Sequence, residues 1–293
     1  MVKYTRMMNM CREWGLTLKN LIRLGDYSKE NILEIFSIAD DLQNGCYSNF
    51  LDRRTVVMFF PAASIRTRVT FEKGVYLLGG KTVIFPPETL DKKEEIKDVI
   101  GYLNHWADVV VVRHKNINIL DKMSQSSNVP IINAMTDINH PCEIISDLYS
   151  LSKIRKDFLK DNYLFVGNKG NIGMAWREAA EVLDLSLSQC CPKGHEISGI
   201  VHYSDINLAV KNKDIICTDS IPKELLEEFK EFQITKEIMN QGNKGALLNP
   251  CPPFYRGEEV SKDVIDSSYF VGYEFKKYLL EIQQAILIFS MTH

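Results

Sequence analysis

The chain has 293 residues, of which 45% are hydrophobic, and its 35 basic and 38 acidic residues give a formal net charge of -3. This composition excludes a disordered or collagen-like chain, and the charge gives no overall attraction to nucleic acid or to an anionic membrane. No apolar run approaches the roughly 20 residues that cross a bilayer. The length indicates about two domains.

Cysteine and histidine usage points to a reducing compartment. The seven cysteines include no CxxC pair, and the six histidines include no HxxxH pair. This pattern predicts neither a disulfide framework nor a zinc site, and the N-terminus lacks the apolar core of a signal peptide. We therefore expect a cytoplasmic protein without a bound metal.

The predicted elements of the first half alternate between strands and helices. A helix begins after the N-cap Ser28, and a later helix ends at Gly79-Gly80. The predicted strands are Thr55–Phe60, Thr82–Phe85, Asp108–Val112 and Pro130–Asn133, and the predicted helices are Arg66–Leu78, Glu94–Trp106 and His140–Ile154.

The second half continues this alternation. It begins with a strand, Tyr163–Val166, that runs into a glycine-rich turn, and it ends with an amphipathic helix, Tyr273–Phe289. The pattern predicts an α/β fold with parallel sheets, and the charged segment Lys153–Asp161 indicates a boundary between two domains of similar size. In such folds a ligand lies at the carboxyl ends of the strands or between domains.

Three segments of the first half carry side chains that suit an anion. Ser64-Ile65-Arg66-Thr67-Arg68 opens a helix, where N–H groups, hydroxyls and a guanidinium suit a phosphate. Taken alone, a capping Ser64 with exposed arginines is the simpler interpretation. Arg113 ends a buried strand, and His140 begins a helix that carries Glu143 one turn further on. His140 is either a donor to an oxygen that becomes negative or only a cap residue.

Two segments of the second half allow several interpretations. The turn Gly167–Gly173 has the spacing GxxGxxG, so a nicotinamide-dependent dehydrogenase is one hypothesis. The next strand, however, ends in Gln189-Cys190 without an acid for a ribose. Asn249-Pro250-Cys251-Pro252 is a rigid loop that either walls a pocket or forms a surface turn.

The order and spacing of these segments resemble the aspartate and ornithine carbamoyltransferase family from about Thr17 to the C-terminus. Each segment is similar to one motif of that family. They are Ser64–Arg68 (SxRTR, for carbamoyl phosphate), Arg113 (the arginine closing the third strand), His140-Pro141-Cys142-Glu143 (HPxQ), Asn249-Pro250-Cys251-Pro252 (HCLP or HPLP) and Arg256-Gly257-Glu258-Glu259-Val260.

The resemblance implies two parallel-sheet α/β domains joined by two helices, at about 140–154 and 274–290, with the active site between the domains. Residues 1–150 and the helix 273–293 would bind carbamoyl phosphate, and residues 151–272 would bind the amine acceptor. The family works as homotrimers with shared active sites, in which a loop of the neighbouring subunit, aligned near Glu88–Glu95, completes each site.

The implied reaction moves a carbamoyl group from carbamoyl phosphate to an amine and releases phosphate, without a metal or organic cofactor. Ser64, Ile65, Arg66 and Thr67 would hold the phosphate. Thr67, Arg113 and His140 would polarise the carbamoyl oxygen as negative charge builds on it. In the family a glutamine at the position of Glu143 accepts from the carbamoyl NH2.

Of the positions that depart from the family pattern, three motivate a second hypothesis. Glu143 replaces that glutamine, Asn249 replaces the motif histidine, and Leu279 stands near the family's arginine in the C-terminal helix. These changes support a second hypothesis, a binding protein that keeps the fold and the anion site but has lost turnover. The dehydrogenase is the third and weakest hypothesis.

The acceptor-binding half is more similar to the ornithine branch. Asp219 matches that branch's acid, which would pair with a cationic amino group, and Asn171 matches its amide in the glycine turn. Asn249, Pro250 and Cys251 would complete the acceptor site. We therefore predict a basic amino acid such as ornithine, with lysine, putrescine or a modified ornithine as alternatives.

Overall fold

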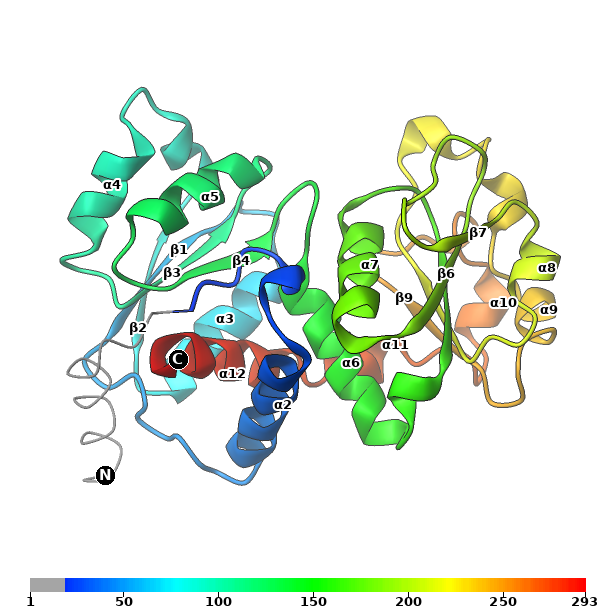
Figure 1. The fold of residues 1–293 in the computed structure, drawn as a ribbon, viewed down its shortest axis with the longest axis horizontal. Coiled ribbons are helices and arrows are strands. Elements are labelled where there is room, and N and C mark those ends of the chain that lie inside the picture. The colour runs from blue at the N-terminus through cyan, green and yellow to red at the C-terminus, as the bar shows by residue number, and fades with distance from the viewer. Residues whose placement is uncertain (1–18) are drawn as a thin grey trace. The chain divides into compact units, whose positions relative to one another are not determined.

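The computed structural model describes residues 19–293, which divide into two compact units (Figure 1). Unit 1 is the chain up to Ser146 together with Tyr278–His293, and unit 2 is Asp147–Lys277. Both are α/β, as predicted. Among residues 19–293, no helix is long and apolar enough to cross a membrane.

Unit 1 is built on a four-stranded parallel sheet in the order β2-β1-β3-β4. The middle strand β3 is a run of valines that are all fully buried, as expected for a parallel strand covered on both faces. The strands are β1 (Thr55–Phe59), β2 (Lys81–Phe85), β3 (Val109–Arg113) and β4 (Ile131–Met135).

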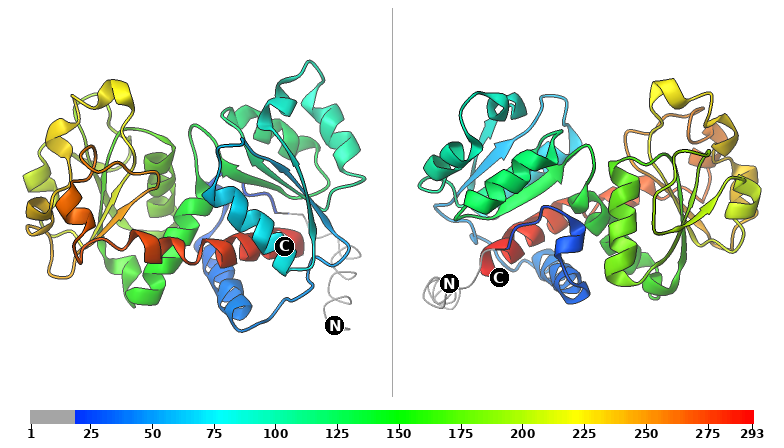
Figure 2. Two further views of the ribbon diagram at one scale, coloured as in Figure 1. Left: turned by 180° about the vertical axis from the view of Figure 1, so that it is seen from behind. Right: turned by 45° about the horizontal axis from the view of Figure 1, so that its top comes forward.

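The helical elements of unit 1 are η1 (Leu24–Asp26), α2 (Lys29–Gln43), α3 (Arg66–Leu77), η2 (Pro87–Asp91), α4 (Ile96–Leu103), α5 (Ile117–Ser126), the first part of α6 (Pro141–Ile154) and α12 (Leu279–Thr292). Helices α4 and α5 cover one face of the sheet, where Ile100 and Leu120 pack against Val110 (Figure 1). Helix α12 packs against α2 and α3 on the other face (Figure 2). Helix α3 ends where predicted, because Gly79 adopts a φ of 80° that glycine tolerates best.

Unit 2 contains a five-stranded parallel sheet in the order β7-β6-β5-β8-β9. Its strands are β5 (Asn162–Val166), β6 (Ser186–Cys190), β7 (Val201–Tyr203), β8 (Ile215–Thr218) and β9 (Leu247–Pro250). Its further helical elements are η3 (Phe158–Lys160), α7 (Asn171–Leu183), α8 (Ile206–Ala209), η4 (Lys223–Leu225), η5 (Lys230–Phe232), α9 (Lys236–Met239), α10 (Lys262–Ile265) and α11 (Gly272–Lys276).

The side chains of alternate residues of β5 point to opposite faces of this sheet. Leu164 and Val166 belong to a core shared with α8, α9 and α10. Tyr163 packs against Trp176 of α7, with 5.7 Å between ring centroids. Helix α7 approaches the strand closely at Gly173, where an added Cβ would lie 2.6 Å from the ring of Phe165. A glycine is therefore required there.

The predicted final helix, Tyr273–Phe289, is divided into α11 and α12. The Ser150 hydroxyl donates a hydrogen bond of 2.6 Å to the carbonyl of Phe275. In an unbroken helix that carbonyl would accept from the N–H of Leu279. A side chain that takes this carbonyl favours a break in the helix, and the chain passes from unit 2 to unit 1 at the same point.

Candidate active site

The strands of unit 1 end at one edge of the sheet and bring the predicted anion-binding residues to it. Phe59 of β1 pairs with Val112 of β3, and Val112 pairs with Asn133 of β4. The segments that follow these neighbouring strand ends carry Ser64, Arg113 and His140. Residues far apart in the sequence therefore follow adjacent strands at the edge where α/β proteins bind ligands.

Ser64 is held by Arg113 rather than by the helix that follows it. Arg113 Nη1 donates a hydrogen bond of 3.1 Å to Ser64 Oγ, and Ser64 is buried. The N-cap of α3 is Ile65, and no side chain caps this end. The capping interpretation of Ser64 is therefore wrong. A hydroxyl and a guanidinium meet at the start of a helix.

The first turn of α3 adds backbone donors beside the Ser64–Arg113 pair. The N–H groups of a first turn have no carbonyl partners within the helix, and this end carries positive partial charge. Thr67 is buried here, whereas Ile65 and Arg66 are exposed. Arg68 instead pairs with Glu72, with 2.6 Å between Nε and Oε1. Two hydroxyls, one guanidinium and a helix N-terminus can hold a phosphate together.

A tight turn between β4 and α6 presents His140. The N–H of Thr136 donates to the carbonyl of Asn139 over 2.8 Å, and the N–H of Asn139 donates to Thr136 Oγ1 over 3.1 Å. His140 lies immediately before α6 and Glu143 lies in its first turn, and both are buried. Burial and the charge of Glu143 raise the pKa of the neighbouring Cys142 thiol, which argues against this cysteine as a nucleophile.

His114, next to Arg113, has a structural role. Its Nε2 lies 3.0 Å from Asp91 Oδ1, and its Nδ1 accepts a hydrogen bond from the N–H of Asn116. These contacts hold η2, which belongs to the segment expected to reach a neighbouring subunit. His114 is thus bonded away from the Ser64–Arg113 pair.

In unit 2, the predicted acceptor-binding residues gather at the carboxyl ends of β5, β8 and β9. Val166 pairs with Thr218, and Thr218 pairs with Pro250. The turn after β5, Asp219 after β8 and Cys251 after β9 therefore follow neighbouring strand ends.

Asp219 lies against the glycine turn. Its Oδ2 is 3.8 Å from the position that a Cβ would take on Gly170, the N-cap of α7, and Asn171 is the first residue of that helix. A carboxylate at this point disfavours a pyrophosphate. In addition, Gln189 is a structural brace, since its amide binds the carbonyl of Gly167 and the N–H of Ile197. Both observations count against the dehydrogenase hypothesis.

Asn249 belongs to a buried polar group that the sequence analysis missed. Its Nδ2 donates to Asp147 Oδ2 over 2.8 Å, and Lys276 Nζ lies 2.5 Å from Asp147 Oδ1. The amide donor of Asn249 is thus occupied, whereas its buried Oδ1 has no partner among residues 19–293. The spacing offered one signal, because Asp147 lies two helical turns after His140 and on the same face of α6.

Glu259 is a second residue that the sequence analysis left without a role. Its Oε1 accepts a hydrogen bond of 2.7 Å from the N–H of Tyr255, and its Oε2 is buried without a partner in the described chain. Burial raises the pKa of Glu259 to about 7, and the charges of Glu258 and Asp219 add to this effect. Thr218 Oγ1, at the end of β8, is also buried and has no hydrogen-bond partner among residues 19–293. Polar atoms in this state mark a place where a ligand or water is expected.

Two further observations bear on the chemistry. Within residues 19–293, no group of three or more histidine, cysteine, aspartate or glutamate side chains could hold a metal ion. Leu279, near the position of the family's arginine, is buried at the start of α12 and brings no charge to unit 1.

Comparison with known proteins agrees with this geometry. The family model for the carbamoyl-phosphate-binding domain of aspartate/ornithine carbamoyltransferases matches residues 19–153, and the model for the aspartate/ornithine-binding domain matches residues 160–290. An ornithine carbamoyltransferase of Methylobacillus flagellatus is 28% identical over 93% of this chain and 97% of its own length. One of Nitrosomonas eutropha is 30% identical over 81% of this chain and 84% of its own.

Solved structures give the same result. The anabolic ornithine carbamoyltransferase of Campylobacter jejuni has a TM-score of 0.87 and 29% identity, covering 93% of this chain and 98% of that one. The ornithine carbamoyltransferase of Pyrococcus furiosus also has a TM-score of 0.87, at 26% identity, over 93% of this chain and 96% of that one. Two domain models that together cover most of the chain show that it belongs to the aspartate/ornithine carbamoyltransferase family.

Proposed function

We propose that the protein transfers the carbamoyl group of carbamoyl phosphate to the amine of a basic amino acid, with ornithine as the first candidate. The observation that carries the proposal is the hydrogen bond between Arg113 and Ser64 at the first turn of α3. It combines a permanent cation with hydroxyl and N–H donors, which is what the phosphate group of an acyl phosphate needs. The relatives compared above are enzymes, which favours turnover over a binding role alone.

In this proposal unit 1 binds carbamoyl phosphate. Ser64, Thr67 and the backbone of Ile65 and Arg66 hold the phosphate, while Arg113 and His140 face the carbamoyl group. A neutral amine attacks the carbamoyl carbon, the bond from that carbon to the bridging oxygen breaks, and phosphate leaves with the electron pair. The attacking nitrogen then loses a proton. Thr67, Arg113 and His140 stabilise the negative charge that builds on the carbamoyl oxygen.

Glu143 would accept hydrogen bonds from the carbamoyl NH2, as the family's glutamine does. A carboxylate accepts at least as well as an amide oxygen. Its charge, however, would repel the phosphate, so we expect weaker binding of carbamoyl phosphate than a glutamine would give.

Unit 2 would bind the acceptor at the edge where β5, β8 and β9 end. The carboxylate of Asp219 pairs with the cationic amino group of the amino acid, and Asn171 contacts its carboxylate or amino group. Asn249 offers an acceptor oxygen, and Pro250 and Cys251 form the wall. The buried side-chain oxygens of Thr218 and Asn249 have no partners in the described part of the chain, which supports a ligand with N–H donors at this edge.

We also propose that the protein is a cytoplasmic homotrimer. Helix α3 and the edge strand β2 pack together and expose a group of large apolar side chains. They are Val69, Tyr76, Leu77, Val83 and Phe85. An apolar surface of this kind is typical of a subunit interface. The cysteine pattern supports the cytoplasm, since no disulfide joins the cysteines of the described chain and most of them are buried.

The test is phosphate release from carbamoyl phosphate by the whole protein, with ornithine, lysine, putrescine and aspartate compared as acceptors. We expect release that depends on the amine, with ornithine ahead of aspartate. Arg113→Ala is the matched inactive variant, and Arg68→Ala, on the neighbouring α3, is the control. Saturable binding of carbamoyl phosphate without release for any amine would instead identify a binding protein.

A further inference from the structure

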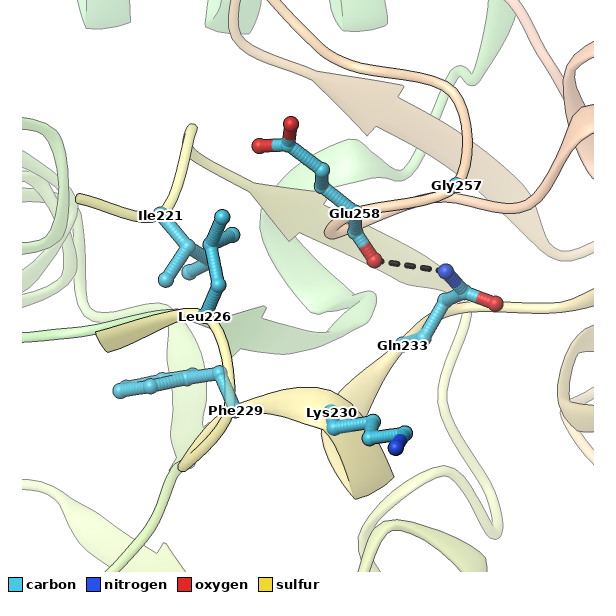
Figure 3. Close-up of a pocket in the computed structure, with 7 residues that line it drawn as sticks. All are labelled: Ile221, Leu226, Phe229, Lys230, Gln233, Gly257 and Glu258. Atoms are coloured by element: carbon cyan, nitrogen blue, oxygen red, sulfur yellow. Dashed lines mark hydrogen bonds between the residues drawn. The ribbon is translucent and has the colours of Figure 1, made fainter. Parts of the chain in front are cut away.

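Unit 2 contains a pocket that the proposed reaction does not use. It encloses about 320 Å³, near the lower end of the range for small-ligand sites. Ile221, Leu226 and Phe229 lie together on one side, and Gly257 and Glu258 lie on another (Figure 3). Gln233 closes the wall between them, because its Nε2 donates a hydrogen bond of 2.7 Å to the carbonyl of Glu258.

The apolar side of the pocket is anchored in the protein interior. Ile221 and Phe229 are buried in a cluster with Cys191, and Leu226 packs against this cluster. The opposite turn is anchored by the contact of Ile234 with Val260. The pocket is therefore bounded by fixed elements and presents a surface that suits a short hydrocarbon chain.

The lining of the pocket holds one carboxylate and one ammonium group, Glu258 and Lys230, and they differ in their partners. Glu258 is half-buried, and no cation of the described chain lies within ion-pair distance of its carboxylate. Lys230 brings the single positive charge of the lining, but it pairs with Glu227 at 3.5 Å and points away from Glu258 (Figure 3).

We propose that this pocket binds a small aliphatic amine, with its hydrocarbon chain on Ile221, Leu226 and Phe229 and its ammonium group at Glu258. This class includes linear diamines and the side chains of ornithine and lysine. An ammonium group is favoured over a carboxylate because Glu258 has no cation of the described chain within ion-pair distance, whereas Lys230 already pairs with Glu227. The inference does not depend on the proposed transfer reaction.

The experiment uses methyl-labelled full-length protein and follows the Ile221 and Leu226 methyl signals by NMR. The probe is 1-aminopentane, and pentanoate is its anionic counterpart of equal chain length. We expect saturable shifts of both methyl signals with the amine and weak or no shifts with pentanoate. Glu258→Gln should weaken amine binding about three- to tenfold. Lys230→Gln should leave the affinity for the amine unchanged or increase it. Glu224→Gln, which changes an exposed residue of the same segment, should leave the affinity unchanged.

Several outcomes would overturn the inference. They are methyl signals that do not respond to the amine, equal affinity for pentanoate, or amine binding that Glu258→Gln does not alter. Phosphate release with ornithine is measured on the same preparations. If release persists without amine binding in the pocket, the pocket proposal fails and the proposed reaction stands. If the amine binds without release for any acceptor, the reverse holds.

Discussion

Replacement of Glu259 by glutamine should make unit 2 more stable at alkaline pH. The carboxylate accepts one hydrogen bond from the N–H of Tyr255, and its other oxygen is buried without a partner among residues 19–293. Glutamine can keep the acceptor oxygen toward Tyr255. It has nearly the same volume and carries no charge, so the substitution isolates the effect of the buried charge.

The magnitude follows from the pKa of Glu259, which burial raises from 4.5 to about 7. A raised pKa means that the folded state holds the proton more tightly than the unfolded state does. The stability that this proton provides is complete below pH 4.5 and is lost as the pH rises through 7. A shift of this size corresponds to about 3 kcal/mol of unfolding free energy. We therefore expect Glu259→Gln to match the unchanged protein near pH 5 and to be about 2–3 kcal/mol more stable at pH 8.

The assay is urea unfolding between pH 5 and pH 8, followed by the fluorescence of Trp176, which is buried in unit 2. A background with Trp14 and Trp106 replaced by phenylalanine makes this signal specific. Glu224→Gln, which removes an exposed carboxylate from the same unit, is the control and should keep the pH dependence of the unchanged protein. An offset between Glu259→Gln and the unchanged protein that is constant from pH 5 to pH 8 would refute the reasoning.

Three further substitutions test the remaining contacts. Arg113→Ala should weaken the binding of carbamoyl phosphate, measured by calorimetry, about ten- to hundredfold, because a charge-assisted contact contributes about 1.5–3 kcal/mol. Arg68→Ala should have a much smaller effect on this affinity. Glu143→Gln should increase the affinity for carbamoyl phosphate severalfold. Equal or weaker binding would contradict the expected charge repulsion. Asp147→Ala should lower the unfolding free energy by about 3–5 kcal/mol, since it leaves the ammonium of Lys276 in a buried site. The double change of both residues to methionine should recover most of this loss in urea unfolding, and no recovery would argue against the charge as the cause.

The strands of the first half were predictable from the sequence because each is a short apolar run bounded by turn residues. Val109–Val112 is the clearest case, since four valines in a row suit a parallel strand covered on both faces. The break between α11 and α12 was not predictable. It contains no glycine or proline, and it coincides with a hydrogen bond from Ser150, more than a hundred residues away in the chain.

The sequence selected the residues of the candidate site but could not show which of them bond to each other. Spacing and residue type selected Ser64 and Arg113, yet the sequence could not show that they bond to each other instead of capping a helix and facing solvent. Glu259 was visible only as part of a motif. Its importance comes from burial and from the nearby Asp219, forty residues earlier in the chain, and both are tertiary properties.

Asn249 shows how a tertiary contact changes the chemistry of a motif position. As a residue type, asparagine offers both a donor and an acceptor. In the structure the Asn249 amide N–H donates to one oxygen of Asp147, and Lys276 pairs with the other oxygen of Asp147. Only the amide oxygen of Asn249 therefore remains for a ligand. Asp219, after the neighbouring β8, also presents an acceptor. A pair of acceptors suits a ligand rich in N–H groups, whereas a side-chain carboxylate would need donors at both positions. The replacement of the motif histidine by asparagine therefore favours a cationic acceptor over aspartate, independently of the match to the ornithine branch.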